Sequence, residues 1–374
     1  MVDYFNKRFP AYYLLIAVLL TSLVFFYFLS KQEKKILESI QNDTNQTYHL
    51  KIKENTAEYL AEQNHANTAV SQSDGLGNNA TTSNTSSYKN EKQVVRANVN
   101  GLTHPILLVE TPSPAPELST LDSSLQQIIK DGKSNGKVQS ASIYIMDLDN
   151  DRWTDVNDKE GYYPGSLMKL AVFICYLKKS EESPEILSKT LILEKSAVVP
   201  GQSYKDQVIQ PNVPYKVSDL FYPMIVRSDN FATLLLNREL DIDELNTLFM
   251  TLGIHKMDMQ NLQYTITASD YSKFLRVLYN ATYLNVKNSQ YALSLLSNST
   301  FTRGLTRDLP KNVMVAHKFG ESVSGEIRQL HESGIVYTGA HTYLITVMTK
   351  GAKVADLADV ICDLSNKVFH YFIP

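Results

Sequence analysis

The spacing of apolar residues changes along the chain and divides it into three segments. Ala11–Leu29 is an uncharged, mostly apolar run of 19 residues, which is long enough to cross the core of a bilayer as one helix. Residues 31–117 are mainly polar, and residues 66–90 contain almost no large apolar side chains, so this stretch cannot bury enough surface to fold alone. From residue 118 to 374, apolar residues recur at helix and strand spacing, which predicts one folded domain.

The first segment, residues 1–30, is predicted to be a retained signal anchor. Its apolar run is longer than that of a usual signal peptide, and Phe25–Phe28 has no pair of small residues suited to cleavage. A cleaved signal peptide is the alternative, and basic residues on both sides leave the orientation ambiguous. Residues 31–117 are interpreted as a largely disordered tether, in which Thr111–Pro116 is a stiff polyproline hinge. We therefore expect a single-pass protein of the cell membrane with its folded domain on the extracytoplasmic side.

The third segment begins and ends with strand patterns and has helical patterns between them. Ser140–Asp147 alternates as a strand, and Arg152–Val156 is its expected hairpin partner. The almost wholly apolar run Leu167–Leu177 predicts a helix that is buried on all sides. Further helices are expected at Leu121–Lys130, Val217–Val226, Asn230–Arg238, Ile242–Leu252, Ala268–Tyr279, Gln290–Leu296 and Val354–Phe369, and further strands at Val313–Phe319, Ser333–Tyr337 and Tyr343–Thr349. The pattern predicts an α/β domain with a mainly antiparallel five-stranded sheet, helices on its faces and an all-helical subdomain inserted near Ser228.

Composition excludes several classes of function. The formal net charge is only -3 and no arginine-rich stretch is present, so no nucleic-acid partner is expected. Cys175 and Cys362 lie in apolar helical patterns and are interpreted as buried free thiols, with a disulfide as the alternative. The eight histidines are scattered, and His331-Glu332 lacks a second histidine four residues after the first. We therefore expect no metal and no cofactor. The sequence gives no signal for an oligomeric state.

Three short motifs follow one another in an order that acyl transfer to serine requires. They are Ser166–Lys169 (SLMK), Ser228–Asn230 (SDN) and Lys318–Gly320 (KFG). A serine hydroxyl becomes a useful nucleophile only when a base removes its proton, and a lysine three residues later lies on the same face of a helix. Burial and a neighbouring ammonium group would lower the pKa of that lysine and allow it to act as a neutral base.

Taken singly, each motif has an ordinary structural explanation. The first can be a helix start with a surface lysine, and the same spacing recurs at Ser86–Lys89 and Ser134–Lys137. The second can be a helix N-cap, for which serine, aspartate and asparagine are all favoured. The third can be a lysine at a strand edge. Their joint order, and the apolar residues around Lys169, favour a catalytic site.

With these motifs the domain resembles the serine β-lactamase and penicillin-binding-protein superfamily, and it is most similar to class A β-lactamases. The resemblance covers about residues 118–374. It is carried by Tyr163–Lys169 (YPGSLMK), Ser228–Asn230, Val315–Gly320 (VAHKFG), Ser333–Tyr337 (SGIVY) and Val347–Gly351 (VMTKG).

The resemblance implies a role for each motif. Ser166 would be the acylated nucleophile and Lys169 its general base. Ser228 would pass a proton to the departing nitrogen. Lys318 would stabilise charge near Ser228 and the substrate carboxylate.

It also implies a substrate-binding set next to these groups. Asn230 would hydrogen-bond the substrate amide and Lys169, and the backbone N–H groups of Ser166 and Glu321 would form an oxyanion hole. Gly320 and Ser322, on the same strand, are the further substrate-binding candidates. Asp229 is expected to brace its loop.

The sequence departs from the family pattern in two places. Class A β-lactamases carry a loop glutamate that activates the deacylating water, but no glutamate lies between Glu244 and Lys318. Leu252–Thr267 must cover the shortened loop, and Asp258 and Asp270 are the carboxylates near it, expected to be solvated and to cap a helix respectively. We therefore expect slow release of the acyl group.

The second departure is Phe319, where the family has threonine or serine, so a hydroxyl that would bind the substrate carboxylate is lost. Ser322, Ser324 and Arg328 are the candidates to replace it.

The predicted function is that of a serine hydrolase that forms an acyl-enzyme on Ser166 with β-lactams or with D-alanyl peptides of the peptidoglycan stem. Two other classes are kept as alternatives. One is a penicillin-binding sensor that is acylated once without turnover. The other is an inactive scaffold of the cell wall.

Overall fold

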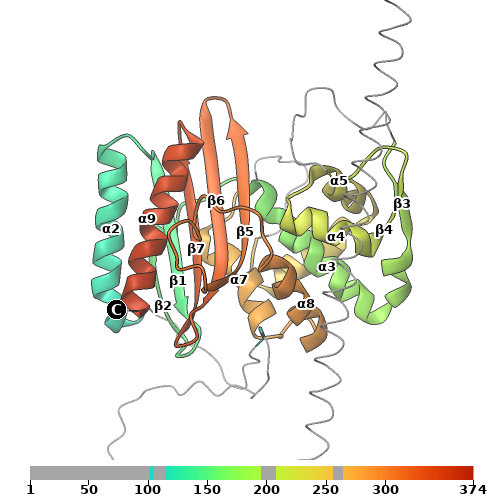
Figure 1. Ribbon diagram of the computed structural model, residues 1–374, viewed down its shortest axis with the longest axis horizontal. Helices are drawn as coiled ribbons and strands as arrows, with labels where there is room; N and C mark the ends of the chain where they lie inside the picture. The colour runs from blue at the N-terminus through green and yellow to red at the C-terminus, as the bar shows by residue number, and fades with distance from the viewer. Residues whose placement is uncertain (1–101, 104–113, 195–207, 256–263, 374) are drawn as a thin grey trace, which may run out of the picture. The chain divides into compact units, whose positions relative to one another are not determined.

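A five-stranded antiparallel sheet forms the middle layer of the domain. The computed structural model describes residues 102–103, 114–194, 208–255 and 264–373, which all belong to one compact unit, Tyr88–Pro374. The strands lie in the order β2-β1-β7-β6-β5 (Figure 1). Their bounds are β1 Ser140–Asp147, β2 Arg152–Val156, β5 Met314–Ser324, β6 Ile327–Tyr337 and β7 Thr342–Gly351. β1 pairs with β7, with Ile145 opposite Ile345, so the two ends of the domain sequence meet in the centre of the sheet.

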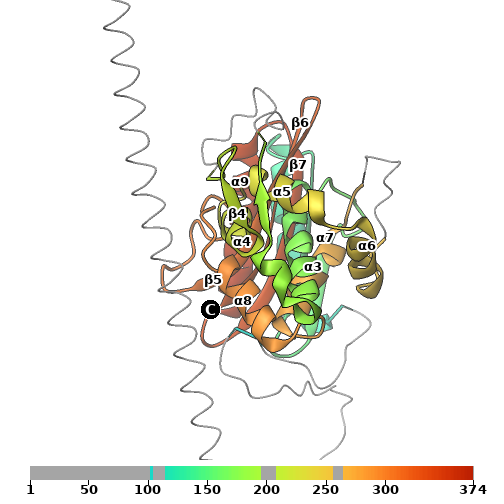
Figure 2. The same ribbon diagram turned by 90° about the vertical axis from the view of Figure 1, so that its right-hand side faces the viewer.

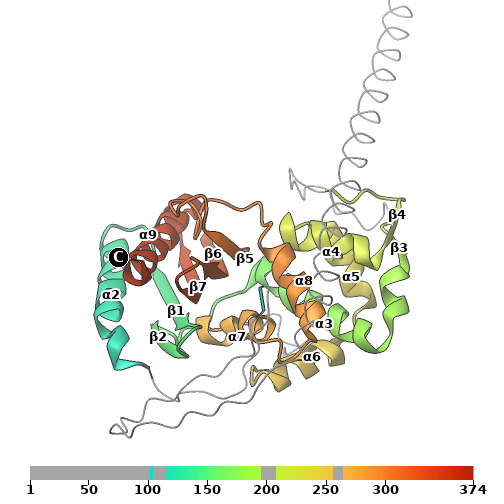
Figure 3. The same cartoon turned by 60° about the horizontal axis from the view of Figure 1, so that its bottom comes forward.

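Alternation along the strands divides the apolar residues between two cores. On β1, Ile143 and Ile145 face one core, whereas Tyr144 and Met146 face the other. Helices α2 (Ser119–Ser134) and α9 (Val354–Phe372) cover the first face, and α7 (Ala268–Tyr279) packs on the second (Figure 3). This three-layer arrangement buries both faces of the sheet.

A helical subdomain lies beyond β5. It contains α3 Lys169–Glu182, α4 Val217–Val226, α5 Asn230–Glu239, α6 Ile242–Thr251 and α8 Val286–Leu296 (Figure 2). The first nine residues of α3, from Lys169 to Leu177, are all buried, as the almost wholly apolar run Leu167–Leu177 predicts. The shorter elements are η1 Pro116–Leu118, η2 Gly165–Met168, η3 Pro184–Ser188, β3 Thr190–Ile192 and β4 Pro214–Lys216. Contacts of β5 with η2 and with α8 join the subdomain to the sheet.

The predicted fold class is confirmed, with changes at particular positions. β6 begins at Ile327, well before the predicted Ser333, because it forms a long hairpin with β5. The small hairpin β3–β4 was not predicted. Asp270 does not cap α7: the N-cap is Thr267, whose hydroxyl accepts the Asp270 N–H at 3.2 Å. Both cysteines are buried free thiols.

The predictions for the first third of the chain fall mostly outside the described residues. The signal anchor at Ala11–Leu29 and most of the tether lie there. No helix in the described part of the chain combines the length and the apolar character that a bilayer crossing needs. Described residues of the predicted tether contact the domain. The N–H groups of Leu102 and Thr103 donate to Gln290 Oε1 at 2.8 and 3.1 Å, so contacts with the domain begin before residue 118.

Candidate active site

Ser166 lies on a turn that is pressed against strand β5. The turn, residues 163–168, leads through η2 into α3, and Ser166 is half-buried. Gly165 has φ +52°, and a Cβ there would lie 2.1 Å from the Glu321 carbonyl oxygen. A Cβ on Gly320 would lie 2.5 Å from the Pro164 carbonyl oxygen. Glycine at both positions is therefore what allows the nucleophile turn to approach the strand so closely.

Hydrogen bonds hold this nucleophile turn from the sheet side. The Tyr163 N–H donates to Gln329 Oε1 at 3.1 Å, and the Tyr163 carbonyl accepts from Ser322 Oγ at 3.2 Å. The same carbonyl lies 3.0 Å from His331 Nε2, and His331 Nδ1 accepts the Thr349 N–H at 3.2 Å. Burial lowers the pKa of His331 to about 4, so the imidazole is neutral at neutral pH and its Nε2–H donates to Tyr163. The backbone of the turn is fixed before any substrate binds.

A buried tyrosine holds the turn from the helical side. The Tyr271 hydroxyl on α7 donates to the Leu167 carbonyl at 2.9 Å. Its side chain is fully buried, and burial raises the pKa of the hydroxyl far above its usual range. Tyr271 therefore remains a hydrogen-bond donor at neutral pH.

Two lysine amines meet at the hydroxyl of Ser228. Lys169 Nζ lies 3.1 Å and Lys318 Nζ 3.0 Å from Ser228 Oγ. Ser228 has φ +57°, a left-handed conformation that is strained for a residue other than glycine. It is held between α4 and α5, and its side chain is 9% exposed. The strained backbone places one hydroxyl within reach of both amines.

Lys169 begins α3 and is almost fully buried, at 4% exposure. Its Nζ also donates to the Ser228 carbonyl and, at 2.7 Å, to Asn230 Oδ1. Burial lowers the pKa of Lys169 to about 7, against an opposite effect of the Asp229 charge. Near neutral pH a substantial fraction of this amine is therefore uncharged, as a general base must be.

Lys318, on β5, has no exposed surface. Its Nζ donates to Ser228 Oγ and, at 2.8 Å, to the Phe319 carbonyl. Burial and the neighbouring Lys169 ammonium lower the pKa of Lys318 well below its usual range, whereas the Glu332 charge acts in the opposite direction. The two amines are thus coupled through charge as well as through Ser228.

Asp229 braces the loop, as the sequence predicts. Its carboxylate caps α5 by accepting the N–H groups of Phe231 at 2.8 Å and Ala232 at 2.9 Å. The same carboxylate accepts the backbone N–H groups of Val208 and Ile209. Asp229 is fully buried. It therefore ties the start of α5, next to Ser228, to the segment at Val208 and Ile209, and it is not among the residues that line the cavity.

A cavity of about 450 Å³ opens beside the nucleophile. Its lining residues come from the nucleophile turn, α3, α5 and β5, and are Gly165, Ser166, Met168, Lys169, Val172, Asn230, Phe231, Thr233, Leu234, Asn237 and Glu321. Among these described residues the only carboxylate is that of Glu321, which lies 3.8 Å from the Arg303 guanidinium. The cavity is large enough for a small-molecule or peptide ligand.

The structure brings most of the predicted site residues together. Ser166, Lys169, Asn230 and Glu321 line the cavity. Behind them, the Ser228 hydroxyl accepts from the amines of both Lys169 and Lys318. The other two substrate-binding candidates have different contacts. Gly320 is buried against Pro164 and Leu167, and Ser322 Oγ donates to the Tyr163 carbonyl.

Sequence reasoning missed the far wall of the cavity. This wall is one face of α5, formed by Asn230, Thr233, Leu234 and Asn237. Their spacing of three and four residues is that of a single helix face. The sequence contained a signal for this wall. Asn230 was already a candidate, and in the predicted helix Asn230–Arg238 the residues three, four and seven positions after it lie on the same face.

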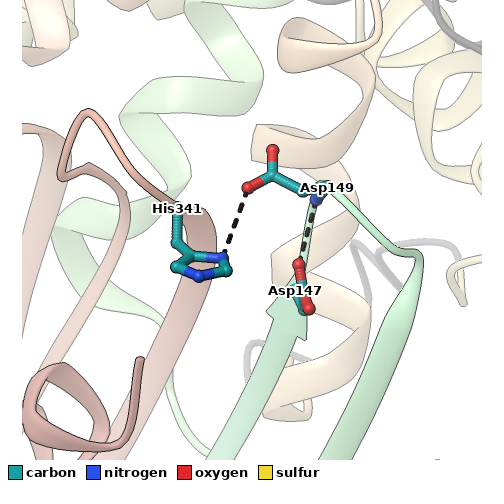
Figure 4. A group of neighbouring side chains, drawn as sticks. All are labelled: Asp147, Asp149 and His341. Atoms are coloured by element: carbon teal, nitrogen blue, oxygen red, sulfur yellow. Dashed lines mark hydrogen bonds and ion pairs between the residues drawn. The ribbon is translucent and has the colours of Figure 1, made fainter. Parts of the chain in front are cut away.

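The described residues contain one group of side chains with the composition of a metal site, away from Ser166. It consists of Asp147, Asp149 and His341 at the ends of β1 and β7 (Figure 4). The Asp147 carboxylate already accepts hydrogen bonds from Arg152 and from the Asn150 side chain, both at 2.8 Å. Asp149 accepts the Thr342 N–H at 2.8 Å. These contacts join two turns of the sheet, and none of the three residues lines the cavity.

The folded domain matches the model of a known protein family. The model of the β-lactamase enzyme family matches residues 120–372, and the chain belongs to that family. It is accordingly a serine hydrolase of the β-lactamase and penicillin-binding-protein type. No curated protein matches the sequence.

Solved structures with the same fold include β-lactamases and a penicillin-binding protein. The TLA-1 extended-spectrum β-lactamase is 20% identical, with a TM-score of 0.60 over 68% of this chain and 99% of that one. PBP-A is 22% identical, with a TM-score of 0.60 over 70% of this chain and 98% of that one. A β-lactamase from Sphaerobacter thermophilus is 18% identical, with a TM-score of 0.58 over 67% and 97%. At these identities the likeness concerns the fold.

Proposed function

We propose that this protein is acylated on Ser166 by β-lactams or by D-alanyl peptides of the peptidoglycan stem, and that it releases the acyl group slowly. The observation that carries the proposal is the shared hydroxyl of Ser228, which lies 3.1 Å from Lys169 Nζ and 3.0 Å from Lys318 Nζ. Those three residues, with Ser166 at the cavity, supply a nucleophile, a base, a relay and a fixed charge without a metal.

In the acylation step, Ser166 Oγ attacks the carbonyl carbon of the scissile amide, and Lys169 as a neutral amine takes its proton. The backbone N–H groups of Ser166 and Glu321 stabilise the resulting oxyanion. The C–N bond then breaks. The proton passes from Lys169 through the Ser228 hydroxyl to the leaving nitrogen, and an ester remains on Ser166. The short Lys169–Ser228–Lys318 contacts support this relay.

Deacylation needs a water molecule and a base to activate it. Glu321 is the only carboxylate among the described lining residues. It stands on β5 and pairs with Arg303 at 3.8 Å. The Glu321 side chain is exposed, and no buried carboxylate lines the described part of the cavity to position a deacylating water. The acyl-enzyme is therefore long-lived, which agrees with a penicillin-binding role better than with rapid β-lactam turnover.

The wall of the cavity suggests which part of the substrate it takes. Met168, Val172, Phe231 and Leu234 form an apolar side, and Asn237 adds a neutral amide at the end of α5. This lining suits an uncharged acyl chain that carries an amide. It does not suit a chain with a carboxylate next to Glu321.

The same function includes a location at the cell membrane. Ala11–Leu29 has the length and composition of a membrane-spanning helix. In this proposal residues 1–30 are a single-pass anchor, residues 31–117 are a tether, and residues 118–374 form the extracytoplasmic hydrolase domain. Fractionation of cells before and after deletion of residues 1–30 tests it: the protein should move from the membrane to the soluble fraction.

The acyl-enzyme is tested by the mass of the intact protein after mixing with penicillin G. A stoichiometric gain of one penicillin that persists for many minutes supports the proposal, and Ser166→Ala must abolish it. Sustained hydrolysis of a chromogenic cephalosporin without an accumulated adduct would show that the protein is an efficient β-lactamase and does not release the acyl group slowly. Absence of both signals would favour the inactive scaffold.

A further inference from the structure

The aromatic ring of Phe319 lies against the buried ammonium group of Lys318. Lys318 Nζ is 4.3 Å from the centre of the ring, a distance at which the face of an aromatic ring attracts a cation. The amine has no exposed surface, so little water competes with the ring. Phe319 is also one of the two places at which the sequence departs from the pattern of the family that it resembles.

The ring is held in place by a stack of side chains. Phe301 lies parallel to Phe319, with 4.3 Å between ring centres and 14° between ring planes. The Arg303 guanidinium lies 5.4 Å from the Phe301 ring centre. Each of the two stacked rings thus has a cationic side chain near it, Lys318 for Phe319 and Arg303 for Phe301. The Phe319 ring therefore has a fixed position from which to act on Lys318.

The other charged groups near Lys318 do not neutralise its ammonium group. Lys169 on α3 repels it. Glu332 on β6 attracts it, but its carboxylate is already paired with His317 Nδ1 at 2.6 Å and with the Leu305 N–H at 2.8 Å. Asp229 acts on Lys169, and Glu321 pairs with Arg303. No described carboxylate forms an ion pair with either amine. Lys169 Nζ donates to three oxygens and Lys318 Nζ to two, so the face of the Phe319 ring is the additional favourable contact on the side of Lys318.

We propose that Phe319 is a positioning residue: it determines which of the two buried amines, Lys318 or Lys169, carries the positive charge. Its ring stabilises the ammonium form of Lys318, so that Lys318 holds the proton when the two amines share one positive charge. Lys169 is then left as the neutral amine that takes the Ser166 proton. The inference rests on the proposed function for its catalytic meaning, but the preference for charge on Lys318 is a property of the free protein.

The direct test is an NMR titration of the protein labelled with ¹³C at lysine Cε. The Lys169 and Lys318 signals are assigned through Lys169→Arg and Lys318→Arg. We expect Lys318 to titrate at higher pH than Lys169. Phe319→Leu keeps an apolar side chain against Phe301 but removes the ring, and it should lower the Lys318 midpoint by about one pH unit. Phe319→Tyr keeps a ring and should restore the midpoint.

Two results would overturn the inference: Lys318 titrating below Lys169 in the unsubstituted protein, or both midpoints unchanged in Phe319→Leu. An acylation assay separates this inference from the proposed function. Phe319→Leu should slow acylation by about tenfold at neutral pH, and Phe319→Tyr should not. If penicillin G never acylates the unsubstituted protein, the proposed function fails, and the titration still decides the role of Phe319.

Discussion

Two buried polar clusters lie on opposite faces of β5, and they differ in charge balance. His317 and Lys318 are consecutive, so their side chains point to opposite sides of the strand. On one side, Glu332 accepts from the Leu305 N–H at 2.8 Å with one oxygen, and the other lies 2.6 Å from His317 Nδ1. On the other side, the two amines share the Ser228 hydroxyl, and no described carboxylate forms an ion pair with either.

The comparison separates a structural cluster from a reactive one. The first is closed, because each oxygen of the buried carboxylate has a partner. In the second, the positive charge is incompletely compensated, and one member, Lys169, reaches a cavity. Uncompensated positive charge in a buried site lowers the pKa of a lysine. Its amine can then be neutral and accept a proton at neutral pH. Stability should therefore depend mainly on the first cluster and activity mainly on the second.

The largest expected effect is on activity when Lys169 is replaced. Lys169→Met removes the base while keeping a long apolar side chain, and it should slow acylation of Ser166 by about 10³-fold. Because a buried amine without a carboxylate partner is lost, the free energy of unfolding should change by only about 1 kcal/mol or less. Stopped-flow acylation and urea denaturation measure the two quantities. A large loss of stability would contradict the separation of roles.

The matching change in the structural cluster should have the opposite profile. Glu332→Ala leaves the buried His317 ring and the Leu305 N–H without their partner, and it should cost about 3–5 kcal/mol of stability. Glu332→Gln, which keeps the size and one acceptor oxygen, is the control and should cost less. Urea denaturation compares the two variants. An unchanged midpoint for Glu332→Ala would show that this cluster does not stabilise the fold.

A third prediction concerns pH. Burial lowers the pKa of Lys169 to about 7, so below that pH the amine is protonated and cannot accept the Ser166 proton. The acylation rate should fall about tenfold per pH unit below 7 and level off above it. His331 should contribute nothing to this limb, because burial lowers its pKa to about 4. A rate that is flat from pH 5 to 8 would exclude Lys169 as the base.

The smallest expected effect is at the edge of the site. The Ser322 hydroxyl donates to the Tyr163 carbonyl at 3.2 Å and thereby holds the nucleophile turn. Ser322→Ala should cost about 1 kcal/mol of stability and slow acylation only a few-fold, since Gln329 and His331 still hold the same residue. Parallel denaturation and acylation measurements check this. If acylation instead falls 100-fold or more with unchanged stability, the hydroxyl acts directly on the substrate.

The spacing of apolar residues along the chain predicted most helices and strands, whereas contacts between distant segments determined the bounds that the sequence did not predict. The alternation of Ser140–Asp147 and the apolar run Leu167–Leu177 specify a buried strand and a buried helix directly. The extension of β6 back to Ile327 depends on pairing with β5. The mixed polarity of the first half of β6 gives no such signal.

The same distinction applies to the site. The order of the motifs was enough to nominate Ser166, Lys169, Ser228 and Lys318 as one set. Sequence could not show that both amines reach the same Ser228 oxygen, because that depends on a positive φ at Ser228 and on a loop braced by Asp229. Nor could it show that Phe319 packs its ring against Lys318.

The most direct test of the central claim, that Lys169 and Ser228 act as one unit, is a double-mutant cycle on the acylation rate. Lys169→Met, Ser228→Ala and the double variant are mixed with penicillin G, and the adduct on Ser166 is followed by intact mass. Groups that move one proton in sequence lose their function together, so the double variant should be about as slow as the slower single variant. Two losses that multiply in the double variant would contradict the account.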